Sequence, residues 1–130
     1  MAEARRTAAE RRTQHDAAAR AWAGVLDRIV LPVSHQMLQA LKAEGHAVQI
    51  FTPAGSVRMG VESRPDDFVE LLLQADRNDS AIVARVSRSY ARETILEERT
   101  FVRGAAAIEA LTEEHVVEFV ASALAEILVR

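Results

Sequence analysis

The ionisable residues of this 130-residue chain do not form a recognisable metal-binding motif. Two histidines at i and i+4 would present two ligands on one helix face, but no pair has that spacing among His15, His35, His46 and His115. The polar segment 76–79 lacks the glycine and distal glutamate of a calcium-binding loop, and its Asp and Asn residues are ordinary turn formers. We therefore predict no metal site and no cofactor.

Nucleophilic catalysis also finds little support in the sequence. There is no cysteine, and the five glycines are isolated, so neither a thiolate nucleophile nor a glycine-rich phosphate-binding loop can be assembled. The adjacent carboxylates Asp66 and Asp67 are interpreted as turn or helix-start residues rather than as an acid–base pair. These observations favour a protein that is not an enzyme.

Arginines that alternate with apolar residues are the strongest candidates for a binding site. Arg58 and Arg85 each lie between two apolar residues of a predicted strand, so we expect both to project from the face that does not meet the core. Arg99, nearby in sequence on the last predicted strand, is the third candidate. Such a face can bind phosphate, an acidic peptide or RNA. The competing interpretation is a solvated face on which arginines pair with the interspersed acids Glu62, Glu70, Glu97 and Glu98.

A long N-terminal helix is the first element that must position these candidates. Between Trp22 and Leu41 apolar residues recur every three or four positions, which predicts one buried helical face within residues 4–44. Pro32 removes a hydrogen bond inside this stripe, but the stripe stays in phase, so we predict a kink rather than two helices. Gly45 predicts the helix end. Residues 1–16 have little to bury and are expected to be frayed or disordered.

The middle of the chain predicts antiparallel strands joined by short turns, at residues 47–52, 57–61, 82–90 and 94–102. Residues 66–76 fit two structures. As a helix they would begin at Pro65; as a strand they would place Phe68 and Leu72 on the face opposite Leu71. The strand is favoured because the run is short and hairpins flank it. A strand that is apolar on both faces needs a second cover, so Phe68 and Leu72 are candidate interface residues.

A C-terminal helix completes the predicted fold. Thr112 is a natural N-cap, and the apolar spacing that follows predicts a helix over residues 113–129. Residues 1–130 are therefore expected to form a single α+β domain. Its predicted core is an antiparallel meander of four or five strands, with the long kinked N-terminal helix and the C-terminal helix packed on one face.

The composition narrows the classes of partner. A net charge of −3 and 5% aromatic residues argue against a dedicated nucleic-acid binder. No apolar run approaches the roughly 20 residues that cross a bilayer, so we expect no membrane association, and the lack of cysteine fits the cytoplasm. The spare apolar surface predicts a small non-enzymatic interaction module, chaperone- or adaptor-like, that acts as a homodimer.

In size, acidity and coarse order of elements the chain is similar to the small dimeric chaperones of type III secretion, although it shares no motif with them. Their middle helix would require residues 66–76 to be helical. One alternative is a small-ligand binder or enzyme with a pocket between sheet and helix, its polar groups supplied by Arg58, Glu62, Arg85 and His46. A further alternative is nucleic-acid association through the arginines near the N-terminus and the arginines of the sheet.

Overall fold

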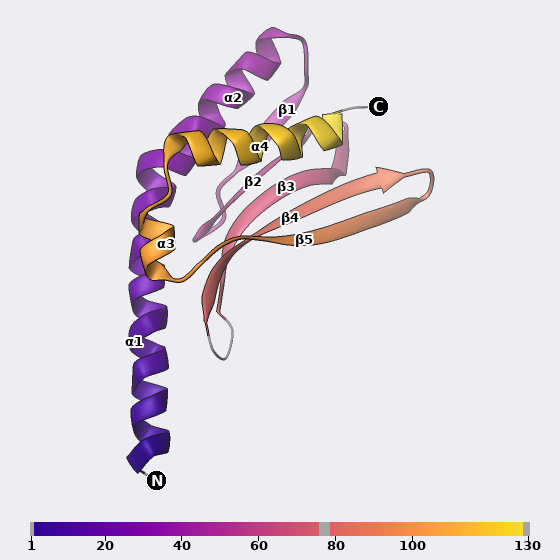
Figure 1. The fold of residues 1–130 in the computed structure, drawn as a ribbon. Helices are drawn as coiled ribbons and strands as arrows, with labels where there is room; N and C mark the ends of the chain where they lie inside the picture. Colours follow the sequence, from indigo (N-terminus) through magenta and orange to yellow (C-terminus); the bar gives the residue numbers. More distant parts are fainter. Residues whose placement is uncertain (1, 76–78, 129–130) are drawn as a thin grey trace.

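The computed structural model describes residues 2–75 and 79–128, with side chains from residue 7 onward (Figure 1). Its elements in chain order are α1 (Ala2–Val25), the π-helical η1 (Leu26–Val30), α2 (Leu31–Ala43), β1 (Val48–Phe51), β2 (Ser56–Val61), β3 (Arg64–Ala75), β4 (Ser80–Tyr90), β5 (Glu93–Arg103), α3 (Ala105–Glu109) and α4 (Glu113–Leu128). The five strands pair antiparallel in the order β1-β2-β3-β4-β5. The predicted α+β meander is confirmed, and α3 is an element that the sequence did not predict.

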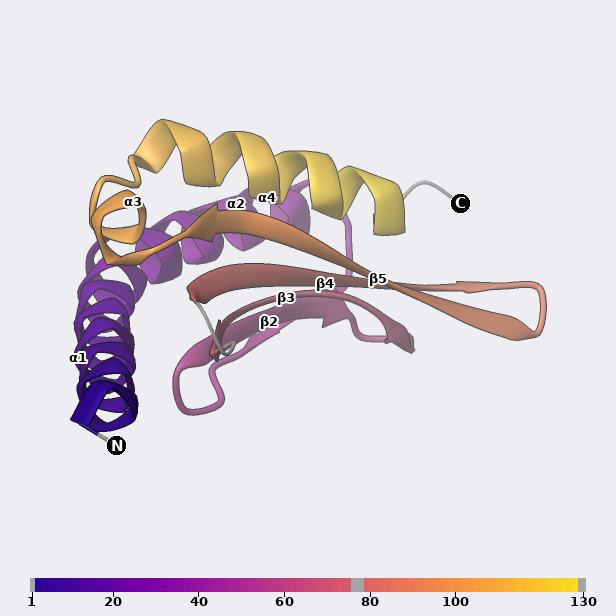
Figure 2. The same ribbon diagram turned by 60° about the horizontal axis from the view of Figure 1, so that its bottom comes forward.

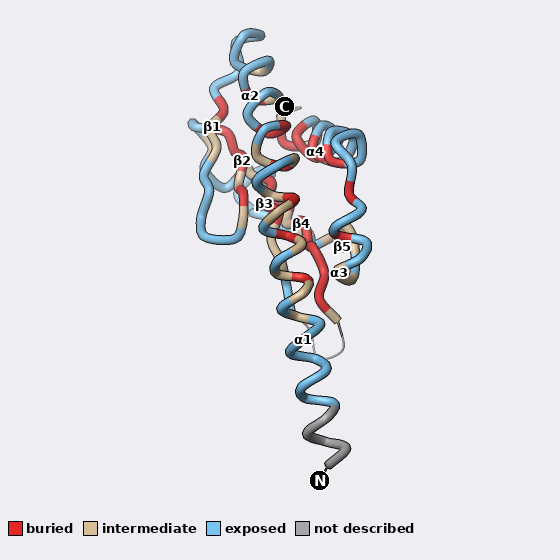
Figure 3. Tube along the Cα trace, turned by 90° about the vertical axis from the view of Figure 1, so that its left-hand side faces the viewer, coloured by how far each residue is buried: buried red, intermediate tan, exposed pale blue. Residues whose placement is uncertain are grey.

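The N-terminal helix changes direction where its backbone widens to the π-helical turn η1, directly before α2 (Figure 1). Pro32 occupies the first turn of α2 and donates no backbone hydrogen bond to the turn before it. A proline and a π-helical turn are both recognised causes of helix bending, so the predicted kink is present and has its irregular turn on the N-terminal side of Pro32. Residues 7–14 of α1 are all exposed (Figure 3).

Helix α2 ends as predicted, with Gly45 in a left-handed conformation at φ 98°. The His46 amide donates to the carbonyl of Leu41 at 3.0 Å, and the Gly45 amide donates to the carbonyl of Lys42 at 3.0 Å. These two bonds satisfy carbonyls that the helix leaves free, and they turn the chain into β1. At the other end of the fold, Thr112 Oγ1 accepts the His115 amide at 3.2 Å and caps α4, as predicted.

Residues 64–75 are a strand, which confirms the favoured alternative for this segment and excludes the helix beginning at Pro65. Asp76, the last residue of the predicted element, lies outside the described residues. The middle helix that the similarity to type III secretion chaperones requires is therefore not formed by residues 66–75. Asp66 and Asp67 are strand residues, not turn or helix-start residues, because cross-strand bonds to β4 hold this segment extended.

Helices α2 and α4 cover one face of the sheet, and no described helix covers the opposite face (Figure 2). The core lies between these helices and the inward-facing strand residues, of which Val57, Met59, Val69, Leu71, Ile82 and Val86 are fully buried. The alternate residues of the same strands project to the other face, which we call the open face. None of the described helices combines the length and the apolar character that a bilayer crossing requires.

Candidate functional site: the open face of the sheet

Four charged side chains form a row across the open face, one from each of β2 to β5. The strand registers pair Arg58 with Glu70, Glu70 with Arg85, and Arg85 with Glu98. Arg58 Nε lies 3.0 Å from Glu70 Oε2, Arg85 Nη1 lies 3.8 Å from Glu70 Oε1, and Arg85 Nε lies 3.0 Å from Glu98 Oε1. We call these four residues the charged row. The structure thus brings together two of the three predicted arginines, Arg58 and Arg85.

Within the charged row the two glutamates neutralise the two arginines. The Glu70 side chain is only 9% exposed because it lies between two guanidinium groups, whereas that of Arg58 is 40% exposed. The Arg58 guanidinium also lies over the Phe68 ring, with Cζ 3.9 Å from the ring centroid, a cation–π contact that holds it flat on the sheet. A free anion would have to compete with these carboxylates. The arrangement therefore resembles a cross-paired protein surface more than an open phosphate site.

Two further rows flank the charged row on the open face. One contains Gly60, Phe68, Ser87 and Leu96; the other contains Ser56, Leu72, Val83 and Thr100. Phe68 and Leu72, the predicted interface residues, lie on this face as expected and are partly buried by their neighbours. Leu96 stands out from the surface and is 56% exposed. The open face therefore mixes a neutral set of charges with apolar side chains that no described helix covers.

A groove of about 490 Å³ lies at the β1–β3 side of the open face. Its lining residues are Gln49, Phe51, Pro53, Arg58, Gly60, Val61, Pro65, Phe68 and Glu70. Gly60 has no side chain to fill the space, and a Cβ atom there would lie 3.1 Å from the Asp67 carbonyl oxygen. This close approach of the two strands favours glycine. Phe51 and Phe68 are the aromatic residues of the groove wall. Its walls suit an apolar side chain.

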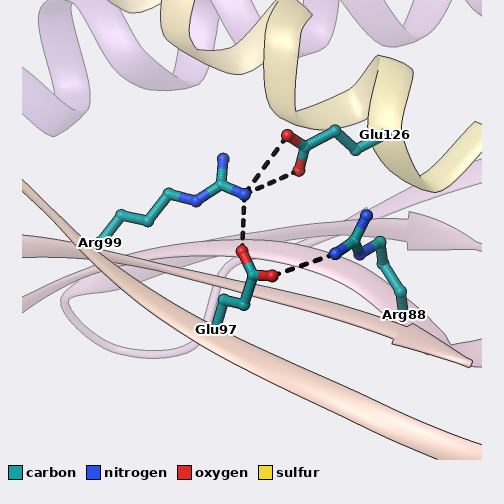
Figure 4. A network of polar contacts seen from close by, with 4 residues as sticks. All are labelled: Arg88, Glu97, Arg99 and Glu126. Atoms are coloured by element: carbon teal, nitrogen blue, oxygen red, sulfur yellow. Dashed lines mark hydrogen bonds and ion pairs between the residues drawn. The ribbon is translucent and has the colours of Figure 1, made fainter.

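Arg99, the third predicted arginine, lies on the helix-covered side of the sheet, because its neighbour Glu98 occupies the open face. Its guanidinium bonds Glu97 at 2.7 Å and Glu126 of α4 at 3.0 Å, and Arg88 bonds Glu97 at 3.0 Å (Figure 4). The hydrogen bond from Arg99, with the charges of Arg99 and Arg88, lowers the pKa of Glu97. The bonds to Glu97 and Glu126 raise the pKa of Arg99. The structure therefore does not bring Arg99 to the other two arginines; it uses Arg99 to join β5 to α4.

This network predicts a loss of stability in acid. Since the folded-state pKa of Glu97 lies below its ordinary value of 4.5, the ionised carboxylate stabilises the fold above that pH. The contribution is lost as the pH falls through the lowered pKa. We expect the difference in midpoint of urea unfolding between the wild type and Glu97→Gln to shrink steadily from pH 6 to pH 3. A difference that stays constant over this range would contradict the assignment.

A second polar cluster, which the sequence did not predict, surrounds the buried Asp67 of β3. The Asp67 side chain is fully buried, and its Oδ1 accepts both the amide and the hydroxyl of Ser89 at 2.6 Å. Arg64 Nε lies 3.3 Å from Asp67 Oδ2, and Arg64 Nη2 donates to the Ile127 carbonyl of α4 at 3.3 Å. The cluster ties β3, β4 and α4 together. Its chemistry is structural, because all of these donors are already engaged.

The histidines do not converge on a site. His15 lies near the start of β4, with Nδ1 3.2 Å from Ser80 Oγ, whereas His35, His46 and His115 are exposed on different elements. In the part of the chain that the structure describes, no three His, Asp or Glu side chains gather as they would around a metal ion. His46 and Glu62, named for a pocket between sheet and helix, are exposed in turns, while Arg58 and Arg85 lie on the far side of the sheet.

No protein-family model, curated protein or solved structure matches this chain.

Proposed function

We propose that this protein is a non-enzymatic interaction module that acts as a homodimer, with the open face as its contact surface. The observation that carries the proposal is the exposure of Phe51 and Leu96 beside the partly buried Phe68 and Leu72, on a sheet face that no described helix covers. An antiparallel sheet that meets water on one face normally alternates apolar and polar residues cleanly. An apolar surface of this kind favours burial against a partner.

The electrostatics of the open face support the same function. Because Glu70 and Glu98 neutralise Arg58 and Arg85, the charged row carries no excess charge that would select a strongly anionic ligand. Polar groups that are paired among themselves can enter an interface with less loss of solvation than isolated charges. A cytoplasmic location, suggested by the cysteine-free sequence, is part of the proposal and rests on composition alone.

Sedimentation equilibrium over a range of protein concentrations tests the proposal directly. We expect a reversible transition from the monomer mass of 14.3 kDa to twice that mass as the concentration rises. The dimer should persist in moderate salt, because apolar burial and not net attraction of charge holds it together. A single monomeric species up to millimolar concentration would overturn the homodimer.

The groove beside Gly60 supports a second candidate function, the binding of a small apolar ligand. Its volume of about 490 Å³ falls within the usual range for ligand pockets, and Arg58 and Glu70 supply polar groups at its rim. Native mass spectrometry of gently purified protein separates the two candidates. A reproducible added mass on the monomer would favour the ligand, whereas a dimer without added mass would favour the interaction module.

Nucleic-acid association receives less support from the described residues. Arg58, Arg85 and Arg99 all have carboxylate partners, so phosphate binding would require these ion pairs to break. Tyr90 is exposed at the tip of the β4–β5 hairpin, away from the paired arginines of the open face. Binding to labelled RNA or DNA at low salt would restore this alternative.

A further inference from the structure

The charged row is complementary to itself when its order is reversed. From β2 to β5 its side chains are a cation, an anion, a cation and an anion. From β5 to β2 the order is an anion, a cation, an anion and a cation, so each place in the reversed row has the charge opposite to that in the original row. A second copy whose strands oppose the first in reversed order therefore sets Arg58 against Glu98, and Glu70 against Arg85.

Two-fold symmetry allows two aligned ways of stacking one open face on another. An axis that runs across the strands places each strand against its own copy, so that Arg58 would oppose Arg58 and Glu70 would oppose Glu70. An axis that runs along the strands, between β3 and β4, places β2 against β5 and β3 against β4. Only the second arrangement pairs unlike charges throughout, and like charges facing each other across an interface are strongly unfavourable.

We infer that the partner of the open face is a second copy of this chain, related by a two-fold axis that runs along the strands between β3 and β4. The inference rests on the proposed homodimer and specifies how its two subunits meet. It predicts contacts between subunits for residues that are distant within one chain. Arg58 and Glu98, for example, lie on strands separated by two others, about 14 Å apart within a monomer.

The two flanking rows fit the same axis. In one row the partner's Leu96 comes to lie over Gly60, where the exposed leucine meets the groove that Gly60 helps to line. In the other row Leu72 of one subunit opposes Val83 of the other, next to the axis. The hydroxyl residues Ser56 and Thr100 oppose each other farther from the axis.

Charge reversal at two positions tests the orientation of the subunits. Arg58→Glu and Glu98→Arg each replace two unlike pairs by like pairs in the symmetric dimer, so each variant is expected to raise the dissociation constant about tenfold or more. Either substitution also disturbs the charged row within the monomer. Circular dichroism and thermal unfolding of each variant therefore establish first that the monomer still folds.

The decisive step is to mix the two variants. In a heterodimer of one Arg58→Glu chain and one Glu98→Arg chain, position 58 of each subunit again opposes a residue of unlike charge at position 98 of the other. Each monomer still carries its own substitution, so any disturbance within the monomer remains. We expect native mass spectrometry to show more heterodimer than random exchange would give, with a dissociation constant close to that of the wild type. A purely structural role of either residue within its own chain cannot produce this rescue.

A matched pair of variants tests the contact at the groove. Leu96 and Ile95 are adjacent and both exposed, at 56% and 43%, but they project to opposite faces of the β4–β5 hairpin. Leu96→Lys should weaken the dimer about tenfold or more, because it would place a charge in the apolar groove. Ile95→Lys should leave the dissociation constant within about twofold of the wild type.

The outcomes separate the orientation from the homodimer itself. If the wild type dimerises but the mixed variants show no rescue, the orientation is wrong and the homodimer stands. If Ile95→Lys weakens the dimer and Leu96→Lys does not, the contact lies elsewhere on the hairpin, and the open-face contact is overturned. If the wild type is monomeric throughout, both the orientation and the homodimer fail.

Discussion

Replacement of Trp22 by alanine is expected to lower the free energy of unfolding by about 4 kcal/mol. Trp22 is 2% exposed and belongs to the hydrophobic core, so truncation removes a large buried ring and leaves a cavity between α1 and the sheet. Its indole Nε1 also donates to the Gly55 carbonyl at 2.8 Å, in the turn between β1 and β2. Urea unfolding followed by circular dichroism measures the effect without depending on the lost fluorophore.

Trp22→Phe is the control that separates packing from the hydrogen bond. It retains a six-membered aromatic ring and loses the five-membered ring of the indole with its N–H, so the expected loss is smaller, about 1–2 kcal/mol. Gly55 is an exposed residue, so water can take the place of the lost donor at its carbonyl, which keeps the cost low. A Trp22→Ala variant as stable as Trp22→Phe would mean that the ring does not carry the packing between α1 and the sheet.

Substitution of Asp67 by alanine is expected to cost about 3 kcal/mol, with a fall in melting temperature of roughly 10 °C. The fully buried carboxylate accepts two hydrogen bonds from Ser89 and lies beside Arg64. Its removal leaves the partly buried Ser89 donors without this acceptor. It also takes an ion-pair partner from Arg64, which bonds the Ile127 carbonyl of α4. Thermal and urea unfolding measure the global effect.

The adjacent Asp66 provides a matched control, because it has the same charge and the same strand but is exposed. Asp66→Ala is expected to change the stability by less than about 0.5 kcal/mol. Amide hydrogen exchange adds a local measurement: the Ser89 N–H should exchange faster in Asp67→Ala and at the wild-type rate in Asp66→Ala. Equal losses in the two variants would contradict the structural role of the buried carboxylate.

Much of the open face was predictable because apolar neighbours fix the direction of a strand residue. Arg58 stands between Val57 and Met59, both fully buried, so its own side chain must lie on the other face. The same rule placed Arg85. For Phe68 and Leu72, the apolar residues on both faces of β3 indicated correctly that one face of this strand lies outside the main core.

Arg99 shows where this rule stops. The sequence Glu97-Glu98-Arg99 has no apolar alternation, so nothing in it tells which side chain faces α4. The strand register decides, by pairing Glu98 with Arg85 on the open face. Asp67 was missed for a related reason, because an acidic pair next to a proline is typical of a turn and only the tertiary contact to Ser89 reveals the buried member. The five-residue helix α3 is too short for a periodic signal.

The order of the strands also has a consequence for biosynthesis. Each strand pairs only with its neighbours in sequence, so the sheet can grow hairpin by hairpin while the chain leaves the ribosome. Helix α4, which packs on β3 and β4, is made after the whole sheet. At ordinary rates of translation the delay is on the order of seconds.

During that interval the nascent sheet exposes apolar side chains such as Val69 and Val86 on one face and Phe68 and Leu72 on the other. The unfinished chain is therefore most prone to aggregation just before α4 emerges, and a general chaperone would act at that stage.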